Sequence, residues 1–159
     1  MVMKIVTIPS LSLRQPSLEV KDFTTIKALV KEMEETIHRA GGVGLAAPQI
    51  GCNLQLFIIR PGLAGDINLP SVYVNPKMKY IGNKIGGLEG CLSIPGKRFL
   101  VQRFEKVIVT AQDIAGGTFK VVCEGWPARV LQHEFSHLNG FLIDAEGVEL
   151  VLPVEGESE

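Results

Sequence analysis

Apolar residues recur three and four positions apart in the segment DFTTIKALVKEMEETIHRAGG, which begins at Asp22. This spacing gathers them on one face of a helix and leaves charged residues on the other. His38 and Arg39 suit the negative C-terminal end of a helix, and the glycines at 41 and 42 can end it. The pattern predicts an amphipathic helix at about residues 23–39, with its apolar face in the core.

Short runs rich in β-branched and aromatic residues indicate strands at residues 54–60 and 71–78, because Gly and Pro bound both runs. Two more runs, at residues 106–113 and 118–125, are joined by Ile-Ala-Gly-Gly and are typical of a hairpin. Apolar residues alternate within this hairpin, so one of its faces should be buried. Cys123 lies on that face and is expected to be a small core residue.

A second helix is predicted at about residues 126–139, within GWPARVLQHEFSHLNG. Pro127 suits the first turn, and Asn139-Gly140 is a stop signal. Apolar residues cover much of the circumference, so this helix should be central and buried. Short strands with two helices and no regular β-α-β alternation predict an α+β fold, in which small, mostly antiparallel sheets pack around the second helix.

The chain has 159 residues, 46% of them hydrophobic and 21% charged, which suits one globular catalytic domain over 1–159. Residues 153–159 read as a short acidic tail. A net charge of -1 argues against direct nucleic-acid binding, and no apolar run approaches the ~20 residues that span a membrane. No signal or transit peptide is evident, and three cysteines make no disulfide framework, so a cytoplasmic location is expected.

The second helix carries an H-E-x-x-H pattern, His133 to His137. Two histidines four positions apart lie on the same side of a helix and can bind one cation. Glu134 beside them can take a proton from a water on that metal. So short a pattern also arises by chance, in paired surface histidines. Burial of the helix favours a metal site, because buried His and Glu side chains without partners would be costly.

Cys91, in the segment LEGCLSIPG, is the candidate for a third metal ligand. The flanking glycines allow close approach to another group. One thiolate with two imidazoles leaves a fourth tetrahedral position open, as catalytic rather than structural zinc-type sites do. The alternative is a core cysteine in a bulged strand.

A third segment, GGVGLAAPQIG at residues 41–51, is rich in glycine and carries one amide side chain, Gln49. It is no phosphate-binding loop, because it lacks Lys-Ser/Thr and follows a helix rather than a strand. Backbone amides with one glutamine suit a peptide-like substrate and its developing oxyanion.

Together, GVGLAAPQ, EGCLS and QHEFSH resemble the three signature motifs of the peptide deformylases, in the same order and with similar spacing. The resemblance covers about residues 4–145. It implies an α+β fold around the H-E-x-x-H helix and removal of the formyl group from the N-terminal formylmethionine of new polypeptides. It also implies one divalent metal ion, commonly Fe²⁺, with Ni²⁺, Co²⁺ or Zn²⁺ able to substitute. The implied partners are formyl-Met nascent chains and, transiently, the ribosome.

The resemblance also assigns roles to residues of this chain. The implied metal ligands are Cys91, His133 and His137, with Glu134 as the general base. The implied oxyanion donors are the Gln49 side chain and the backbone N–H of Leu92. The implied substrate contacts are Gly44 and Arg98 for the peptide backbone, and Val43, Trp126, Arg129 and Val130 for the methionine side chain.

The chain departs from the family at Ser136, where the family has Asp. That Asp is expected to pair with an arginine matching Arg103. Arg103 should therefore either face solvent or pair with another carboxylate, with Glu105 the nearby candidate. The sequence GVELVLPVEGESE that follows is not expected to form a helix of any length.

Two alternatives stay open at this stage. Another H-E-x-x-H amidase or peptidase would need a ligand after His137, where no histidine follows and the candidates are Asp144, Glu146 and Glu149. A non-catalytic relative that binds nascent chains would have lost part of the chemistry, yet no expected ligand or base is missing.

Overall fold

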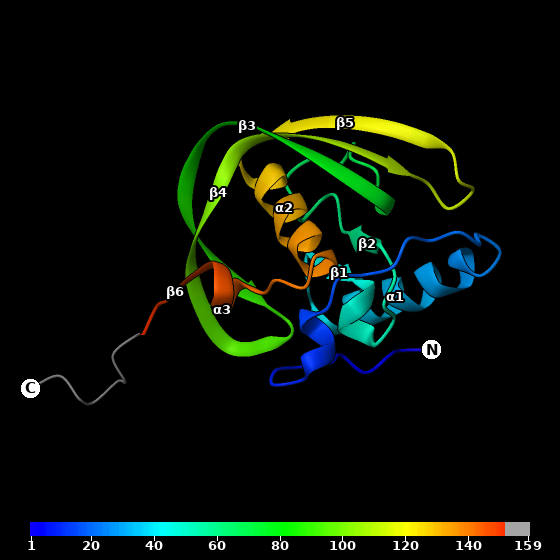
Figure 1. Cartoon of the computed structure of the whole chain (residues 1–159), viewed down its shortest axis with the longest axis horizontal. Helices are drawn as coiled ribbons and strands as arrows, with labels where there is room; N and C mark the ends of the chain where they lie inside the picture. Colours follow the sequence, from blue (N-terminus) through cyan, green and yellow to red (C-terminus); the bar gives the residue numbers. More distant parts are fainter. Residues whose placement is uncertain (152–159) are drawn as a thin grey trace, which may run out of the picture.

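Two long antiparallel strands, β3 (Val72–Cys91) and β4 (Ile94–Gln112), dominate the fold in the computed structural model, which describes residues 1–151. Their pairing is interrupted by register shifts at Val74/Lys77, Ile81/Lys84 and Glu89/Cys91. Such bulges bend a strand pair and increase its twist. The hairpin accordingly arches over one helix, as Figure 1 shows.

All of the named strands join one sheet, in the order β1-β2-β3-β4-β5, with β6 paired to β4. Every pairing between them is antiparallel. The other strands are β1 (Gly44–Ala46), β2 (Leu56–Ile59), β5 (Thr118–Glu124) and β6 (Gly147–Glu149). The predicted α+β class is confirmed, although the strands form one curved six-stranded sheet instead of several small ones.

The helices are α1 (Ile26–Ala40), α2 (Trp126–Leu138) and the single turn α3 (Ile143–Glu146). Two 3₁₀ turns, η1 (Leu11–Arg14) and η2 (Ala47–Ile50), complete the helical elements of residues 1–151. Helix α1 begins three residues later than its apolar pattern predicts, because the Asp22 carboxylate accepts hydrogen bonds from the Thr24 N–H and hydroxyl and holds a local turn.

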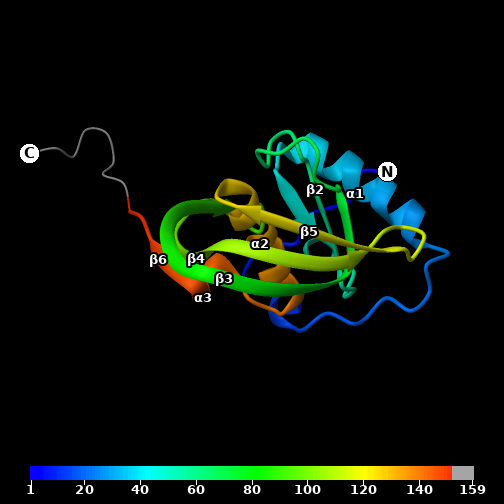
Figure 2. The same cartoon turned by 90° about the horizontal axis from the view of Figure 1, so that it is seen from above.

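Strand β2 lies between α1 and α2 and is buried on both faces. Leu56 and Ile58 pack with the apolar face of α1, whereas Phe57 and Ile59 pack with α2 and the long strands. Alternate side chains of a strand point to opposite faces, so four consecutive apolar residues fill both cores. Seen from above, α1 lies outside the sheet and α2 beneath the arch of β3 and β4 (Figure 2).

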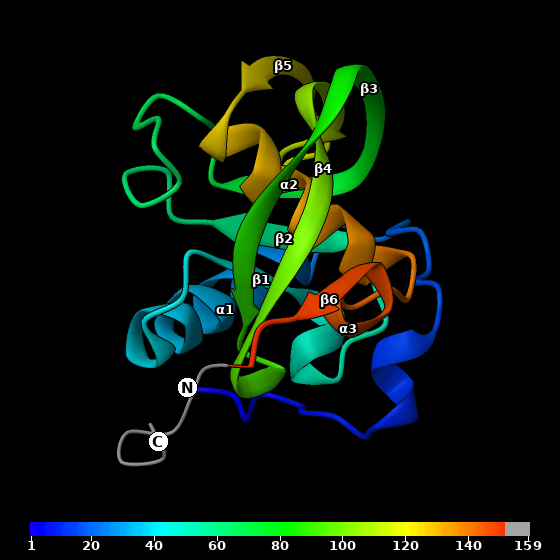
Figure 3. The same cartoon turned by 90° about the vertical axis from the view of Figure 1, so that its left-hand side faces the viewer.

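The segment after α2 returns to the sheet. A third core cluster joins Leu13 of η1 with Phe99 of β4 and with Leu142 and Ile143 at the start of α3. Strand β6 then pairs with residues 99–101 of β4, and Figure 3 shows α3 and β6 against that strand. Of the segment expected to form no long helix, residues Gly147–Glu149 form β6; the acidic tail, 153–159, lies outside the described residues. None of the helices described has the length and apolar character that crossing a bilayer requires.

Candidate metal centre and its cleft

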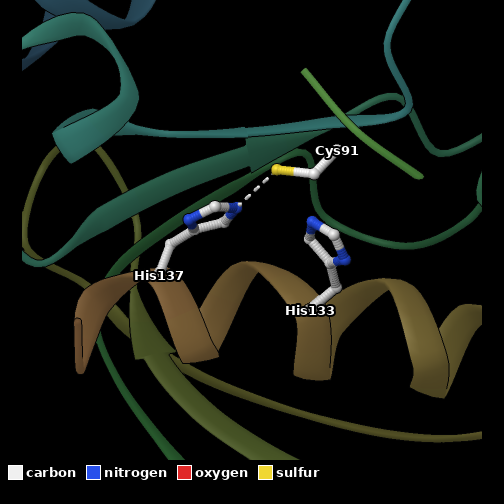
Figure 4. A group of neighbouring side chains, drawn as sticks. All are labelled: Cys91, His133 and His137. Carbon is white, nitrogen blue, oxygen red and sulfur yellow. Dashed lines mark hydrogen bonds between the residues drawn. The ribbon is translucent and has the colours of Figure 1, made fainter. Parts of the chain in front are cut away.

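Helix α2 presents His133 and His137 on one face. Gly125, with φ 72°, precedes the helix, and Pro127 lies in its first turn, as its sequence predicts. The two imidazole rings lie 5.1 Å apart, centroid to centroid, at 64° to each other. Figure 4 shows both rings rising from the helix toward Cys91. Helical spacing of four residues therefore brings two nitrogen donors together.

Cys91 reaches the histidines because it is the last residue of β3, at the tip of the long hairpin. A two-residue turn, Leu92-Ser93, links it to β4. Its Sγ atom lies 3.4 Å from Nε2 of His137, and one donor atom from each of the three residues lies within 4.8 Å of the others. All three cysteines are free thiols, and Cys123 packs in the core as predicted.

These three side chains fit a divalent metal. Two imidazoles and a thiol are a donor set that zinc and ferrous-type ions accept, and they leave a position for water. Within residues 1–151, the buried Nδ1 atom of His137 has no hydrogen-bond partner, while its Nε2 atom faces the sulfur. Burial and the neighbouring His133 lower the pKa of His137 well below its usual value, so this ring is neutral, as a metal ligand must be.

His133 is oriented by Glu89, which lies within 2.8 Å of its Nδ1 atom. A carboxylate on one ring nitrogen fixes the imidazole and leaves the other nitrogen for a ligand bond. Burial opposes a charged His133, but hydrogen bonds to Cys91 and Glu89 outweigh it and raise the pKa of His133 to about 10. The site therefore favours one positive charge beside the thiol, which a bound metal would supply in place of the proton.

Glu89 is a functional residue that the sequence reasoning did not single out. Its side chain is only 4% exposed, yet it accepts two hydrogen bonds from Arg103, both at 2.9 Å, and one from Arg129 at 2.7 Å. Burial would raise the pKa of Glu89, but the bonds from His133 and Arg103 outweigh it and hold this pKa well below its usual range. The sequence feature that could have identified Glu89 is its position two residues before the expected ligand Cys91, in a segment with no other charged residue.

Arg103 pairs with other carboxylates, as one of the two expectations for it stated, but the named candidate Glu105 was wrong. Arg103 is 5% exposed, and it pairs with Glu89 and Glu146 rather than with Glu105. A register shift between Ile81 and Lys84 lies opposite Glu105, whose carboxylate accepts a hydrogen bond from the Asn83 N–H instead. Glu146 arrives from α3, which no local pattern in β4 could indicate.

Glu134 lies beside His133 with its carboxylate buried and its Oε2 atom unpartnered within residues 1–151. Burial and the nearby Glu89 charge raise the pKa of Glu134 to about 7. A carboxyl group with such a pKa can accept and return a proton near neutrality. Gly44 faces this carboxylate so closely that a Cβ there would lie 2.6 Å from its carboxyl carbon. Gly44 thus makes room for Glu134.

The Gln49 amide is held in one orientation. Its Oε1 atom accepts a hydrogen bond from the Ala46 N–H at 2.9 Å, so its Nε2 group faces Ser93 Oγ at 3.1 Å and the Cys91 sulfur at 3.7 Å. Leu92 follows Cys91 in the hairpin turn. Both residues therefore lie beside the candidate metal ligands.

A cleft of about 720 Å³ opens above these groups. The structure brings every predicted site residue to this cleft except His137, which is buried behind its wall and touches the lining residue Cys91. The predicted substrate contacts that line it are Val43, Gly44, Arg98, Trp126, Arg129 and Val130. The guanidinium of Arg129 is engaged by Glu89 and two backbone carbonyls, and the Trp126 N–H bonds to Leu63 O.

Fold and site together define a hydrolase with a candidate metal centre. The family model described as polypeptide deformylase matches residues 2–146. The chain belongs to the polypeptide deformylase family.

Relatives and solved structures agree with that assignment. The chain is 37% identical over 141 residues to the peptide deformylase of Dictyoglomus turgidum, covering 89% of this chain and 88% of that protein. It is 41% identical over 142 residues to the peptide deformylase of Aquifex aeolicus, covering 88% and 84%.

The crystal structure of peptide deformylase from Thermotoga maritima matches with a TM-score of 0.86 at 33% identity, over 92% of this chain and 97% of that one. A peptide deformylase from Synechococcus elongatus, solved in complex with actinonin, matches with a TM-score of 0.83 at 37% identity, over 91% and 78%.

The protein is accordingly a peptide deformylase: it removes the N-formyl group from nascent polypeptides. Neither a different H-E-x-x-H peptidase nor a non-catalytic nascent-chain binder is favoured. The Cys91, His133 and His137 group supports a bound metal in this enzyme.

Proposed function

We propose that Cys91, His133 and His137 bind the catalytic metal ion of this deformylase and that Glu134 moves the proton of the reaction. The observation that carries the proposal is the convergence of one sulfur and two ring nitrogens within 4.8 Å, beside a buried carboxylate. When bound there, a divalent metal acts as a Lewis acid and makes water a stronger nucleophile. Fe²⁺ is the ion proposed, as the family resemblance implies, with Ni²⁺, Co²⁺ or Zn²⁺ as substitutes.

Glu134 acts first as a base and then as an acid. Its carboxylate takes the proton of the attacking water, and it returns that proton to the nitrogen of the departing amine. A pKa raised to about 7 by burial suits both steps. Formate and a free α-amino terminus are the products.

Gln49 and Leu92 stabilise the negative charge that develops on the formyl oxygen. The Ala46 N–H fixes the carbonyl end of the Gln49 amide, so its NH₂ end is aimed in advance at the reacting region. The Leu92 N–H is the second donor, adjacent to the ligand Cys91. Preorganised donors of this kind cost little reorganisation during the reaction.

The cleft binds the formylated N-terminus of the nascent chain. Gly44 and Arg98 hold the peptide backbone. The first side chain, that of methionine, enters the apolar part of the cleft lined by Val43, Trp126, Arg129 and Val130. The alkyl part of Arg129 serves here, since its guanidinium is held by Glu89.

We propose further that residues 1–159 act as one catalytic domain that binds formyl-Met nascent chains and contacts the ribosome transiently. The expected cytoplasmic location stays a prediction.

The test combines metal analysis with formate release from a formyl-Met peptide. Cys91→Ser should lose most of its bound metal and its activity, because the hydroxyl is a poorer ligand than a thiolate. Cys52→Ser is the matched control, since Cys52 is partly buried away from the cleft, and it should keep both. Full metal content and activity in Cys91→Ser would refute the proposed ligand set.

A further inference from the structure

Ser136 and Glu146 form a closed triangle of hydrogen bonds with Arg103. The Arg103 Nη1 group donates to Glu146 Oε2 at 3.1 Å and to Ser136 Oγ at 3.2 Å. The Ser136 hydroxyl in turn donates to the same Glu146 oxygen at 2.9 Å. A hydroxyl can donate once while accepting from another group, so one serine serves both neighbours.

This triangle completes the charge balance around the candidate metal ligand His133. Glu89 alone contacts two guanidiniums, those of Arg103 and Arg129, as well as the His133 ring. Glu146 is the second carboxylate, so the cluster holds two guanidiniums and two carboxylates. Without Glu146, a guanidinium that is only 5% exposed would share a single carboxylate with another cation.

The three members come from different elements. Arg103 lies on β4, Ser136 on α2, and Glu146 is the last residue of α3. Glu89 receives both the Arg103 guanidinium and the His133 ring on its Oε1 atom. A displacement of Arg103 therefore moves the carboxylate that orients His133.

We infer that Glu146, held by Ser136, is a positioning residue of the metal centre, acting on His133 through Arg103 and Glu89. The inference rests on the proposed role of His133 as a ligand. The Glu146 carboxylate on α3 supplies the charge that an aspartate at position 136 would supply on α2. Ser136 contributes to the positioning, because its hydroxyl donates a hydrogen bond to that carboxylate.

The arrangement predicts that Ser136→Asp has opposite effects in the wild-type protein and in a Glu146→Gln variant. Ser136→Asp alone would place a carboxylate beside Glu146, where like charges repel. In a Glu146→Gln background the same aspartate would restore the lost negative charge next to Arg103. We therefore expect Ser136→Asp to be favourable only when Glu146 is neutralised. A double-mutant cycle measures this coupling between positions 136 and 146.

The experiment compares wild type, Glu146→Gln, Ser136→Asp and the double variant, each as the holoenzyme. The measurements are Zn²⁺ affinity against a chelator, melting temperature, and kcat and KM with a formyl-Met peptide. Glu146→Gln should bind Zn²⁺ about 10-fold more weakly, the lower end of the range for groups that orient ligands. Its kcat should fall with little change in KM, because the cleft lining is untouched.

The double variant should recover metal affinity, kcat and melting temperature toward wild type, whereas Ser136→Asp alone should improve none of them. Glu105→Gln is the matched control: it removes one carboxylate from β4 outside the cluster. Zn²⁺ affinity in Glu146→Gln equal to that of the control would overturn the inference, as would a double variant no better than Glu146→Gln.

A His133→Ala variant distinguishes a failure of the proposed ligand set from a failure of the positioning role of Glu146. If His133→Ala kept its Zn²⁺, the proposed ligand set would fail, and this inference with it. If His133→Ala lost Zn²⁺ while Glu146→Gln bound it as tightly as wild type, the positioning role of Glu146 alone would fail.

Discussion

The Nδ1 atom of His133 lies 2.8 Å from the Oε1 atom of Glu89, on a carboxylate that also carries the guanidiniums of Arg103 and Arg129. One buried acid thus links the helix that bears the histidines to the long hairpin that bears Cys91. The orientation of His133 and the attachment of the hairpin to α2 depend on the same group.

Glu89→Gln should destabilise the protein strongly. The amide keeps the shape of the side chain but removes the charge, which leaves two guanidiniums without their shared partner. Breaking a buried pair in this way costs about 3–5 kcal/mol. Urea unfolding measures the change, with the exposed Glu124→Gln on β5 as control. A free energy of unfolding equal to that of the control would show that Glu89 carries no structural charge balance.

Glu134→Gln should keep the metal and lose activity. The amide is similar in size but cannot accept the proton, and an acid–base group contributes about 10²–10⁴-fold in rate. Metal content and formate release, measured on the same preparation, give the two readouts. Loss of metal in this variant would instead mean that Glu134 is a ligand.

Gly44→Ala should lower activity while the fold is retained. The added methyl group would meet the Glu134 carboxylate and displace it, and a misplacement of about 1 Å in a reacting group can cost up to about 10²-fold in rate. Gly62→Ala is the control, because a Cβ there meets only the Ile67 side chain at 3.4 Å. Steady-state kinetics of the two variants test this; equal rates would show that the carboxylate tolerates the methyl group.

Asp144→Asn should reduce stability slightly, and only above acidic pH. The hydrogen bonds and charge of Arg14 lower the pKa of Asp144. A carboxylate with a lowered folded-state pKa stabilises above its unfolded pKa, and that contribution is lost as pH falls through the folded value. For a pair about one-third exposed, the loss near neutral pH should be about 0.2–1 kcal/mol.

Thermal melting of wild type and Asp144→Asn between pH 7 and pH 3 gives the comparison. The two curves should differ at neutral pH and converge at the acidic end. A difference that grew toward low pH would contradict the assigned sign.

The sequence by itself determined the elements with strong local patterns. The spacing of apolar residues defines α1, and Pro127 with Asn139-Gly140 defines the ends of α2, because helix periodicity and end signals depend on nearby residues alone. The H-E-x-x-H spacing likewise decides that His133 and His137 share a helix face. The motif resemblance gave the family, which the comparisons confirm.

The sequence predicted only part of the long hairpin that β3 and β4 form. Residues 79–105 contain glycines and charged residues in place of a regular alternation, since register shifts interrupt β3 and β4 and much of the pair is exposed. Strand pairing over this distance is set by backbone hydrogen bonds to a remote partner, which leave no mark in a local window.

The tertiary structure alone decided which charges meet. Glu89, Arg103 and Glu146 are separated by 14 and 43 residues along the chain, and the packing of β3, β4 and α3 brings them to one buried cluster. Arg103 pairs with Glu146 rather than with Glu105, which is two residues away in the sequence. An unpaired buried charge is costly, so a buried guanidinium pairs with the carboxylate that the packed elements place beside it. Local sequence fixes which groups a helix presents together, whereas the partner of a buried ion is fixed only when distant elements pack.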